Sequence, residues 1–198
     1  MDEAEWLTGT DPSPMLMVLR NCSSDRKRRL FAVAACRTAP EIYALDCVGP
    51  VLAAAERFAD DHADSTLIDI FSANLRFEEV QVERMRREGR LEVAWLRMVS
   101  EIGATPVIVP QLRGTGWLLR DIFGNPFRPV AFDPAWRSEA AVGIARGIYD
   151  DRAFERLPIL ADTLQDAGCE HSDILAHCRE PGTHVRGCWV VDLVLGKV

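Results

Sequence analysis

The sequence contains no run of about 20 consecutive apolar residues, the length that a membrane-spanning helix requires. It also lacks an excess of basic residues, because 23 Lys and Arg stand against 30 Asp and Glu and give a net charge of -7. An acidic chain is poorly suited to bind nucleic acid, so we do not expect that class of partner. The N-terminus, MDEAEWLTGTDPSP, lacks the basic and then apolar pattern of a secretory signal. Together these absences predict a cytoplasmic protein without a membrane segment.

Several motifs that carry chemistry are missing as well. There is no Walker loop and no GxGxxG fingerprint, so nucleotide binding has no support. The sequence has no CxxC, CxxH or HxxxH pair and no cysteine-protease signature. Adjacent acids such as Glu78 and Glu79 point about 100° apart on a helix and do not converge on one substrate. We therefore assign no catalytic residue, and the sequence favours a non-enzymatic role.

The composition is that of an ordinary globular protein, with 48% hydrophobic and 27% charged residues among 198. Apolar residues recur at spacings of three and four over most of the chain, which predicts a mainly α, compact helical domain. The expected helices cover 13–20, 24–38, 51–60, 65–102, 117–123, 138–150, 152–167 and 172–179. Residues 184–195 (HVRGCWVVDLVL) fit a helix or a buried strand, and their valines favour the strand slightly.

The chain divides by composition into three parts, which we interpret as one domain overall. Residues 1–102 form an N-terminal helical half, and 137–198 form a C-terminal helical half. Between them, 103–136 is rich in proline and glycine and predicts an ordered connector. The aromatic residues Phe123, Phe127 and Trp136 in or beside this connector either anchor it to the helices or bind a partner protein.

Cysteine and histidine gather near the C-terminus, at Cys169, His171, His177, Cys178, His184 and Cys188. Thiolate and imidazole are the ligands that zinc prefers. His184 and Cys188 are four residues apart, so a helix or a strand would place them on one face. The zinc hypothesis uses Cys169, His177, His184 and Cys188, with Cys178 as the alternative to His177. The favoured interpretation is that these cysteines are small core residues, in which case the protein has no cofactor. A Cys–His nucleophile is a third alternative.

Two further features lie near residue 24. Ser24 and Lys27 match the short pattern SxxK, but the serine stands where a helix N-cap belongs, so we interpret it as a cap. The basic run that follows, from Arg26 to Arg29, predicts the solvated face of a helix rather than a nucleic-acid contact.

Five segments resemble a family of uncharacterised proteins that is abundant in planctomycete bacteria. They are DEAEWLTGTDPSPML, SDRKRRLFAVAACR, LLRDIFGNPFRPVAFDPAW, LPILADTLQDAGC and HVRGCWVVDLVLGK. The resemblance covers both ends of the chain and the connector. It implies a bacterial cytosolic protein with many paralogues, and it implies no activity.

The sequence as a whole predicts a non-enzymatic protein–protein interaction or regulatory module of a bacterial cytosolic system. The first alternative is a zinc-dependent protein whose C-terminal Cys/His cluster forms a structural or hydrolytic site. The second is a component of a bacterial defence or toxin–antitoxin system, by analogy with other families rich in paralogues.

Overall fold

The computed structural model describes residues 1–20, 23–38, 48–60 and 114–197. The chain forms two compact units. Unit 1 contains Met1 and residues 8–117, and unit 2 contains residues 2–7 and 118–198. The division after Trp117 falls inside the predicted connector. The helical pattern expected over 65–102 lies outside the described residues.

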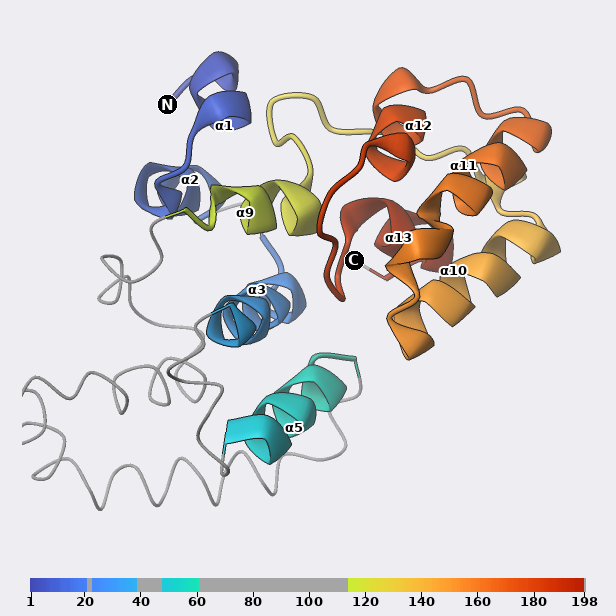
Figure 1. Ribbon diagram of the computed structural model, residues 1–198. Coiled ribbons are helices and arrows are strands. Elements are labelled where there is room, and N and C mark those ends of the chain that lie inside the picture. The colour runs from blue at the N-terminus through green and yellow to red at the C-terminus, as the bar shows by residue number, and fades with distance from the viewer. Residues whose placement is uncertain (21–22, 39–47, 61–113, 198) are drawn as a thin grey trace, which may run out of the picture. The chain divides into compact units, whose positions relative to one another are not determined.

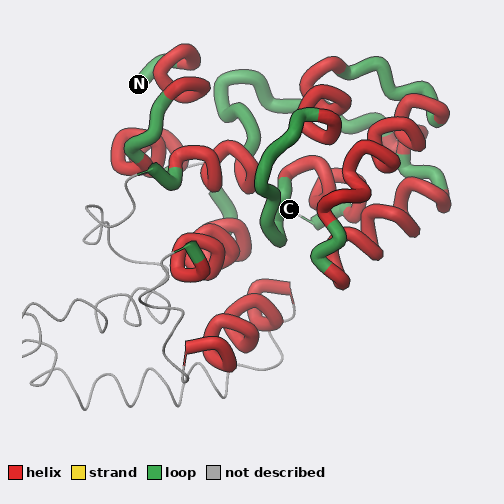
Figure 2. The backbone as a smooth tube through the Cα atoms, in the orientation of Figure 1, coloured by secondary structure: helices red, strands yellow, loops and turns green. Residues whose placement is uncertain are grey.

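The described part of the chain is helical, with nine α-helices and no strand (Figures 1 and 2). This confirms the mainly α class. The helices are α1 (Glu3–Thr8), α2 (Pro12–Leu19), α3 (Asp25–Arg37), α5 (Val48–Asp60), α9 (Gly116–Phe123), α10 (Glu139–Asp151), α11 (Leu157–Asp166), α12 (Ser172–Arg179) and α13 (Trp189–Leu195). Two short 3-10 helices, η2 (Pro134–Trp136) and η3 (Phe154–Arg156), precede α10 and α11. No helix in the described ranges is both long and apolar enough to span a membrane.

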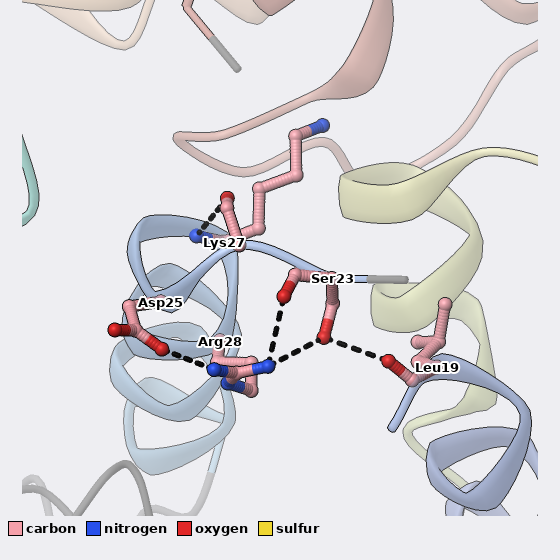
Figure 3. Close-up of polar contacts among 6 residues, drawn as sticks. Leu19, Ser23, Asp25, Lys27 and Arg28 are labelled. Atoms are coloured by element: carbon pink, nitrogen blue, oxygen red, sulfur yellow. Dashed lines mark hydrogen bonds and ion pairs between the residues drawn. The ribbon is translucent and has the colours of Figure 1, made fainter. Parts of the chain in front are cut away.

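Helix α3 of unit 1 begins after an N-cap serine, Ser24, as the sequence predicts. The Ser24 hydroxyl accepts a hydrogen bond from the Lys27 backbone N–H at 3.3 Å (Figure 3). Beside it, the Arg28 guanidinium donates to the Ser23 carbonyl and hydroxyl oxygens and pairs with Asp25. The SxxK pattern is therefore the start of a helix, in which a polar side chain satisfies a backbone donor.

Two arginines of the basic run of α3 contact the neighbouring helix α5. Arg26 pairs with Asp60 of α5 at 3.0 Å, and its side chain is only 10% exposed. The Arg29 guanidinium lies 4.5 Å from the ring centroid of Phe58, also on α5. The expected solvated face is therefore wrong for Arg26 and Arg29, whose charges meet partners on α5 and join the two helices, whereas the Arg28 side chain is 35% exposed.

Unit 2 is built around one apolar core, shared by α10, α11, α12 and α13. Its fully buried members include Ile148, Leu157, Leu160, Leu164, Ile174, Val190 and Val194. Helix α10 begins at Ser138, whose hydroxyl accepts a hydrogen bond from the Ala141 backbone N–H. The 152–167 pattern divides into η3 and α11, with Pro158 in the first turn of α11.

The N-terminal residues 2–7 belong to unit 2, where Trp6 is completely buried. The Trp6 indole Nε1 donates to the Gly124 carbonyl at 3.1 Å. In return, Arg120 of α9 donates to the Trp6 carbonyl at 3.0 Å. A third contact joins Asn125 to the Glu3 carboxylate at 2.7 Å. The first helix is thus fixed to the end of α9 by hydrogen bonds through both the side chain and the backbone of Trp6.

The strand favoured for 184–195 is wrong, because this segment forms a tight turn followed by α13. The Cys188 N–H donates to the Val185 carbonyl at 3.0 Å, and Gly187 has a φ of 97°. That backbone angle suits glycine and turns the chain. The buried valines of α13 are Val190, Val191 and Val194. This spacing matches one face of a helix and not the alternation of a strand.

Candidate metal centre

Four side chains of unit 2 gather at one point: Asp121, His177, His184 and Cys188. Each offers one ligand atom, and these atoms all lie within 4.8 Å of one another. Asp121 comes from the last turn of α9 and His177 from α12, while Cys188 directly precedes α13. The segment between α12 and α13 passes the C-terminal end of α9 (Figure 1). His184 lies in this segment and contacts Asp121. Residues distant in sequence therefore form one compact donor set.

The distances within the group suit a small cation. His177 Nε2 lies 3.2 Å from Cys188 Sγ and 3.3 Å from Asp121 Oδ1. In a tetrahedral zinc site, bonds of 2.0–2.1 Å to nitrogen and oxygen and of about 2.3 Å to sulfur separate N and O ligand atoms by about 3.3 Å and N and S by about 3.5 Å. The contact between His177 and Asp121 fits this geometry, and the contact between His177 and Cys188 would open by about 0.3 Å around an ion. His184 Nδ1 lies closer to Asp121 Oδ1, at the hydrogen-bond distance of 2.6 Å. That pair would open by about 0.7 Å around an ion.

The Asp121 carboxylate is fixed by the protein at both oxygens. Oδ1 faces the two histidines, while Oδ2 accepts a hydrogen bond from the Val185 backbone N–H at 2.9 Å. Asp121 is 4% exposed, and burial alone would raise its pKa. Hydrogen bonds and charge interactions with His177 and His184 outweigh burial and hold the pKa of Asp121 below its ordinary value. The carboxylate thus stays ionised, and Oδ1 is the oxygen left to face a cation.

The turn from Val185 to Cys188 positions two of the ligands. Because the turn closes between the Val185 carbonyl and the Cys188 N–H, His184 and Cys188 stand on either side of it. The Val185 N–H at its start is the same group that binds Asp121. One short loop therefore supplies a nitrogen ligand, a sulfur ligand and the hydrogen bond that orients the carboxylate.

Aromatic rings surround the two imidazoles. The His177 and His184 rings are edge-to-face, with centroids 5.0 Å apart. Trp189 lies 5.2 Å from His177, and Phe154 lies 6.4 Å from His184. This apolar shell limits the access of water to the ligands, which strengthens charge interactions inside it.

The Cys188 thiol is not arranged as a nucleophile. It is completely buried, and burial together with the negative charge of Asp121 raises its pKa well above the ordinary value. Asp121 and Cys188 also approach the same nitrogen of His177, Nε2, whereas a catalytic triad needs the acid on the other ring nitrogen. The geometry favours a metal ligand over the Cys–His nucleophile considered from the sequence.

Three of the four residues in the zinc hypothesis come together in the structure, namely His177, His184 and Cys188. Cys169 is fully buried but is not a member of the group. Cys178 is a buried core residue, and burial raises its pKa to about 12. The fourth position of the group belongs to Asp121, which the sequence reasoning missed. The sequence signal for Asp121 is an acid inside the apolar helix GWLLRDIF, where Leu119 and Ile122 are fully buried.

The predicted partner-binding aromatics have different environments. Phe127 is 39% exposed, although one edge of its ring meets Trp6. Phe123, the last residue of α9, is partly buried. Trp136 packs against the core of unit 2 and lies edge-to-face with Phe132 at 5.4 Å. Trp136 thus anchors the connector, and partner binding by these residues stays a prediction.

No known protein-family profile, no curated protein and no solved structure matches this chain.

Proposed function

We propose that the protein binds one zinc ion through Asp121, His177, His184 and Cys188, and that the ion has a structural role in unit 2. The observation that carries this proposal is the convergence of four donor atoms within 4.8 Å, from residues spread over positions 121–188. In zinc proteins such a closed set of four protein ligands is typical of a structural site.

The mixture of donors supports zinc over other cations. Magnesium and calcium prefer oxygen ligands throughout, and here three of the four donors are nitrogen or sulfur. Zinc accepts carboxylate oxygen, imidazole nitrogen and thiolate sulfur in one coordination shell. Binding would release the proton of the Cys188 thiol, so affinity falls as the pH is lowered.

A closed site also supports a non-enzymatic role. When four protein ligands surround zinc, no position is left for a substrate or an activated water. The ion would then hold the loop of His184 and Cys188 on α9, and the protein would act through its surface. This agrees with the absence of a nucleotide or nucleophile motif from the sequence.

The test is metal content, measured by mass spectrometry on protein purified without an affinity metal column. We expect about one zinc per chain, and a chelator should lower the melting temperature by about 10 °C or more. The matched pair of variants is Cys188→Ser and Cys169→Ser, since both cysteines are fully buried and only Cys188 belongs to the group. Cys188→Ser should lose the zinc and Cys169→Ser should keep it. A metal-free wild-type protein with an unchanged melt would contradict the proposal.

Cobalt substitution separates a structural site from a catalytic one. Four protein ligands predict the intense visible absorption of tetrahedral cobalt, which azide should leave unchanged because no position is open. A spectrum that azide shifts would show an open position and would favour hydrolytic chemistry instead.

Protein–protein interaction is the second candidate role, favoured by two large exposed side chains of unit 2. Leu7 is 51% exposed and Phe127 is 39% exposed. Both adjoin Trp6, because Leu7 follows it in the chain and the Phe127 ring contacts its indole. A photo-crosslinking residue at position 127, introduced in cells, should give a discrete adduct. The control is position 159, because Ile159 is 55% exposed in the same unit. Equal adducts at both positions would contradict a specific surface at Phe127.

A further inference from the structure

Trp189 lies between a metal-centre ligand and the end of α9. It is the first residue of α13 and directly follows Cys188. Its ring centroid is 5.2 Å from that of the His177 imidazole, at an interplanar angle of 53°. Trp189 therefore contacts one ligand through its side chain and is bonded to another through the backbone.

Gly124 leaves the space that Trp189 occupies. A Cβ atom at Gly124 would lie 3.2 Å from Cδ2 and 3.3 Å from Cγ of the indole, which is tighter than most packing contacts. Gly124 also has a φ of 68°, a conformation that glycine adopts without strain. The carbonyl of this same glycine accepts the hydrogen bond from Trp6. The backbone that supports Trp189 is thus itself held in place by α1.

His177 is the ligand that solvent reaches most easily. Its side chain is 18% exposed, compared with 10% for His184 and 5% for Asp121. Cys188 is completely buried. Since an ion and a competing chelator must approach through the most accessible ligand, exchange of the metal should proceed by release of His177.

We propose that Trp189 is the positioning residue of the metal centre, and that it sets the rate of metal exchange by holding the His177 imidazole toward the other donors. The inference rests on the zinc site proposed above. The indole packs against the imidazole at a centroid distance of 5.2 Å and thereby limits its rotation. A zinc ligand that is held this way dissociates rarely, so the ion exchanges slowly.

The experiment measures zinc release to a colorimetric chelator from wild-type protein and from Trp189→Leu. Neighbours that orient metal ligands typically change metal affinity by about 10–100-fold, and we expect faster release by a similar factor. Trp189→Phe keeps an aromatic ring and should restore the wild-type rate to within about threefold. The control is Trp136→Leu, a partly buried tryptophan that packs on the same core. This variant should release zinc at the wild-type rate even if it melts earlier.

Gly124→Ala provides an independent test that keeps the tryptophan. The added methyl group pushes the indole away from α9 and should also accelerate release. Circular dichroism identifies any variant that does not fold. If either Trp189→Leu or Gly124→Ala fails to fold, the release rate of the other variant tests the role of Trp189. Wild-type protein without zinc would overturn the proposed function itself. Zinc-loaded wild-type protein together with wild-type release rates in folded Trp189→Leu or Gly124→Ala would overturn only the role of Trp189.

Discussion

Asp121 Oδ1 and His184 Nδ1 lie 2.6 Å apart, although the two residues are 63 positions apart in the chain. The contact joins α9 to the loop that precedes α13, and the Val185 N–H reinforces it at the second carboxylate oxygen. This buried carboxylate is therefore both the proposed zinc ligand and a tie between distant segments of unit 2.

Replacing Asp121 with asparagine should destabilise the protein even without metal. Asp121→Asn keeps the shape of the side chain but removes the charge that faces the two histidines. We expect the metal-free variant to lose about 1–3 kcal/mol of unfolding free energy at pH 7, measured by urea denaturation.

The pH dependence of that loss has a defined sign. Because the folded-state pKa of Asp121 lies below its ordinary value, the carboxylate contributes stability that is complete above the ordinary pKa. The contribution disappears as the pH falls through the folded-state pKa. The difference between metal-free wild-type protein and Asp121→Asn should therefore be constant down to about pH 5 and shrink in more acidic solution. A difference that grows on acidification would contradict this assignment.

Gly187→Ala should weaken zinc binding by straining the turn between His184 and Cys188. Gly187 has a φ of 97°, which an L-residue adopts at a cost of about 1 kcal/mol or more. We expect a lower melting temperature and a weaker zinc affinity in a competition titration. Gly143→Ala is the control, because Gly143 lies within α10 and has no atom within 4 Å of an added Cβ. That control should leave stability unchanged or raise it by about 0.5–1 kcal/mol.

Two buried cysteines should resist alkylation in the native protein. Burial raises the pKa of both Cys36 and Cys178 to about 12, so almost no thiolate is present at pH 8. Peptide mass spectrometry after iodoacetamide treatment should find both unmodified in buffer and modified in urea. Rapid modification of either residue in buffer would show that its environment is more open than the structure indicates.

Unit 1 contains a buried ion pair whose removal should be costly. Glu56 of α5 is 4% exposed, and Arg37 of α3 contacts both of its carboxylate oxygens, with Nη2 2.9 Å from Oε2. Arg37→Met removes the cation and should lower the unfolding free energy by about 3 kcal/mol. Adding Glu56→Gln should recover part of that loss, because the buried charge is gone. A double variant as unstable as the sum of the two single variants would argue against coupling.

Local sequence signals predicted the local structure well. Ser24 and Ser138 act as N-caps because a short polar side chain before an apolar periodic run satisfies the first backbone donors. Helix α2 is capped by Asp11, whose carboxylate accepts hydrogen bonds from both the N–H and the hydroxyl of Ser13. Asp11 and Ser13, on either side of Pro12, offer the same signal, so the sequence alone does not decide between them.

The candidate site was only partly predictable, for a physical reason. His184 and Cys188 are close in the chain, and their spacing indicated a shared face. Asp121 joins them only because α9 and the C-terminal loop meet in the folded unit, and no local spacing encodes that approach. The strand expected over 184–195 failed for a local reason, since Gly187 turns the chain before Val190 and Val191, which then lie in a helix.

The position of residues 2–7 in unit 2 affects how the chain folds during its synthesis. Trp6 leaves the ribosome 118 residues before Gly124, the residue whose carbonyl it binds. During synthesis the Trp6 indole therefore stays exposed until α9 has been synthesised. A bulky fusion placed directly before α1 would delay or block the packing of Trp6 against the end of α9. The fusion would therefore destabilise unit 2 rather than the residues of unit 1 that follow α1 in the chain.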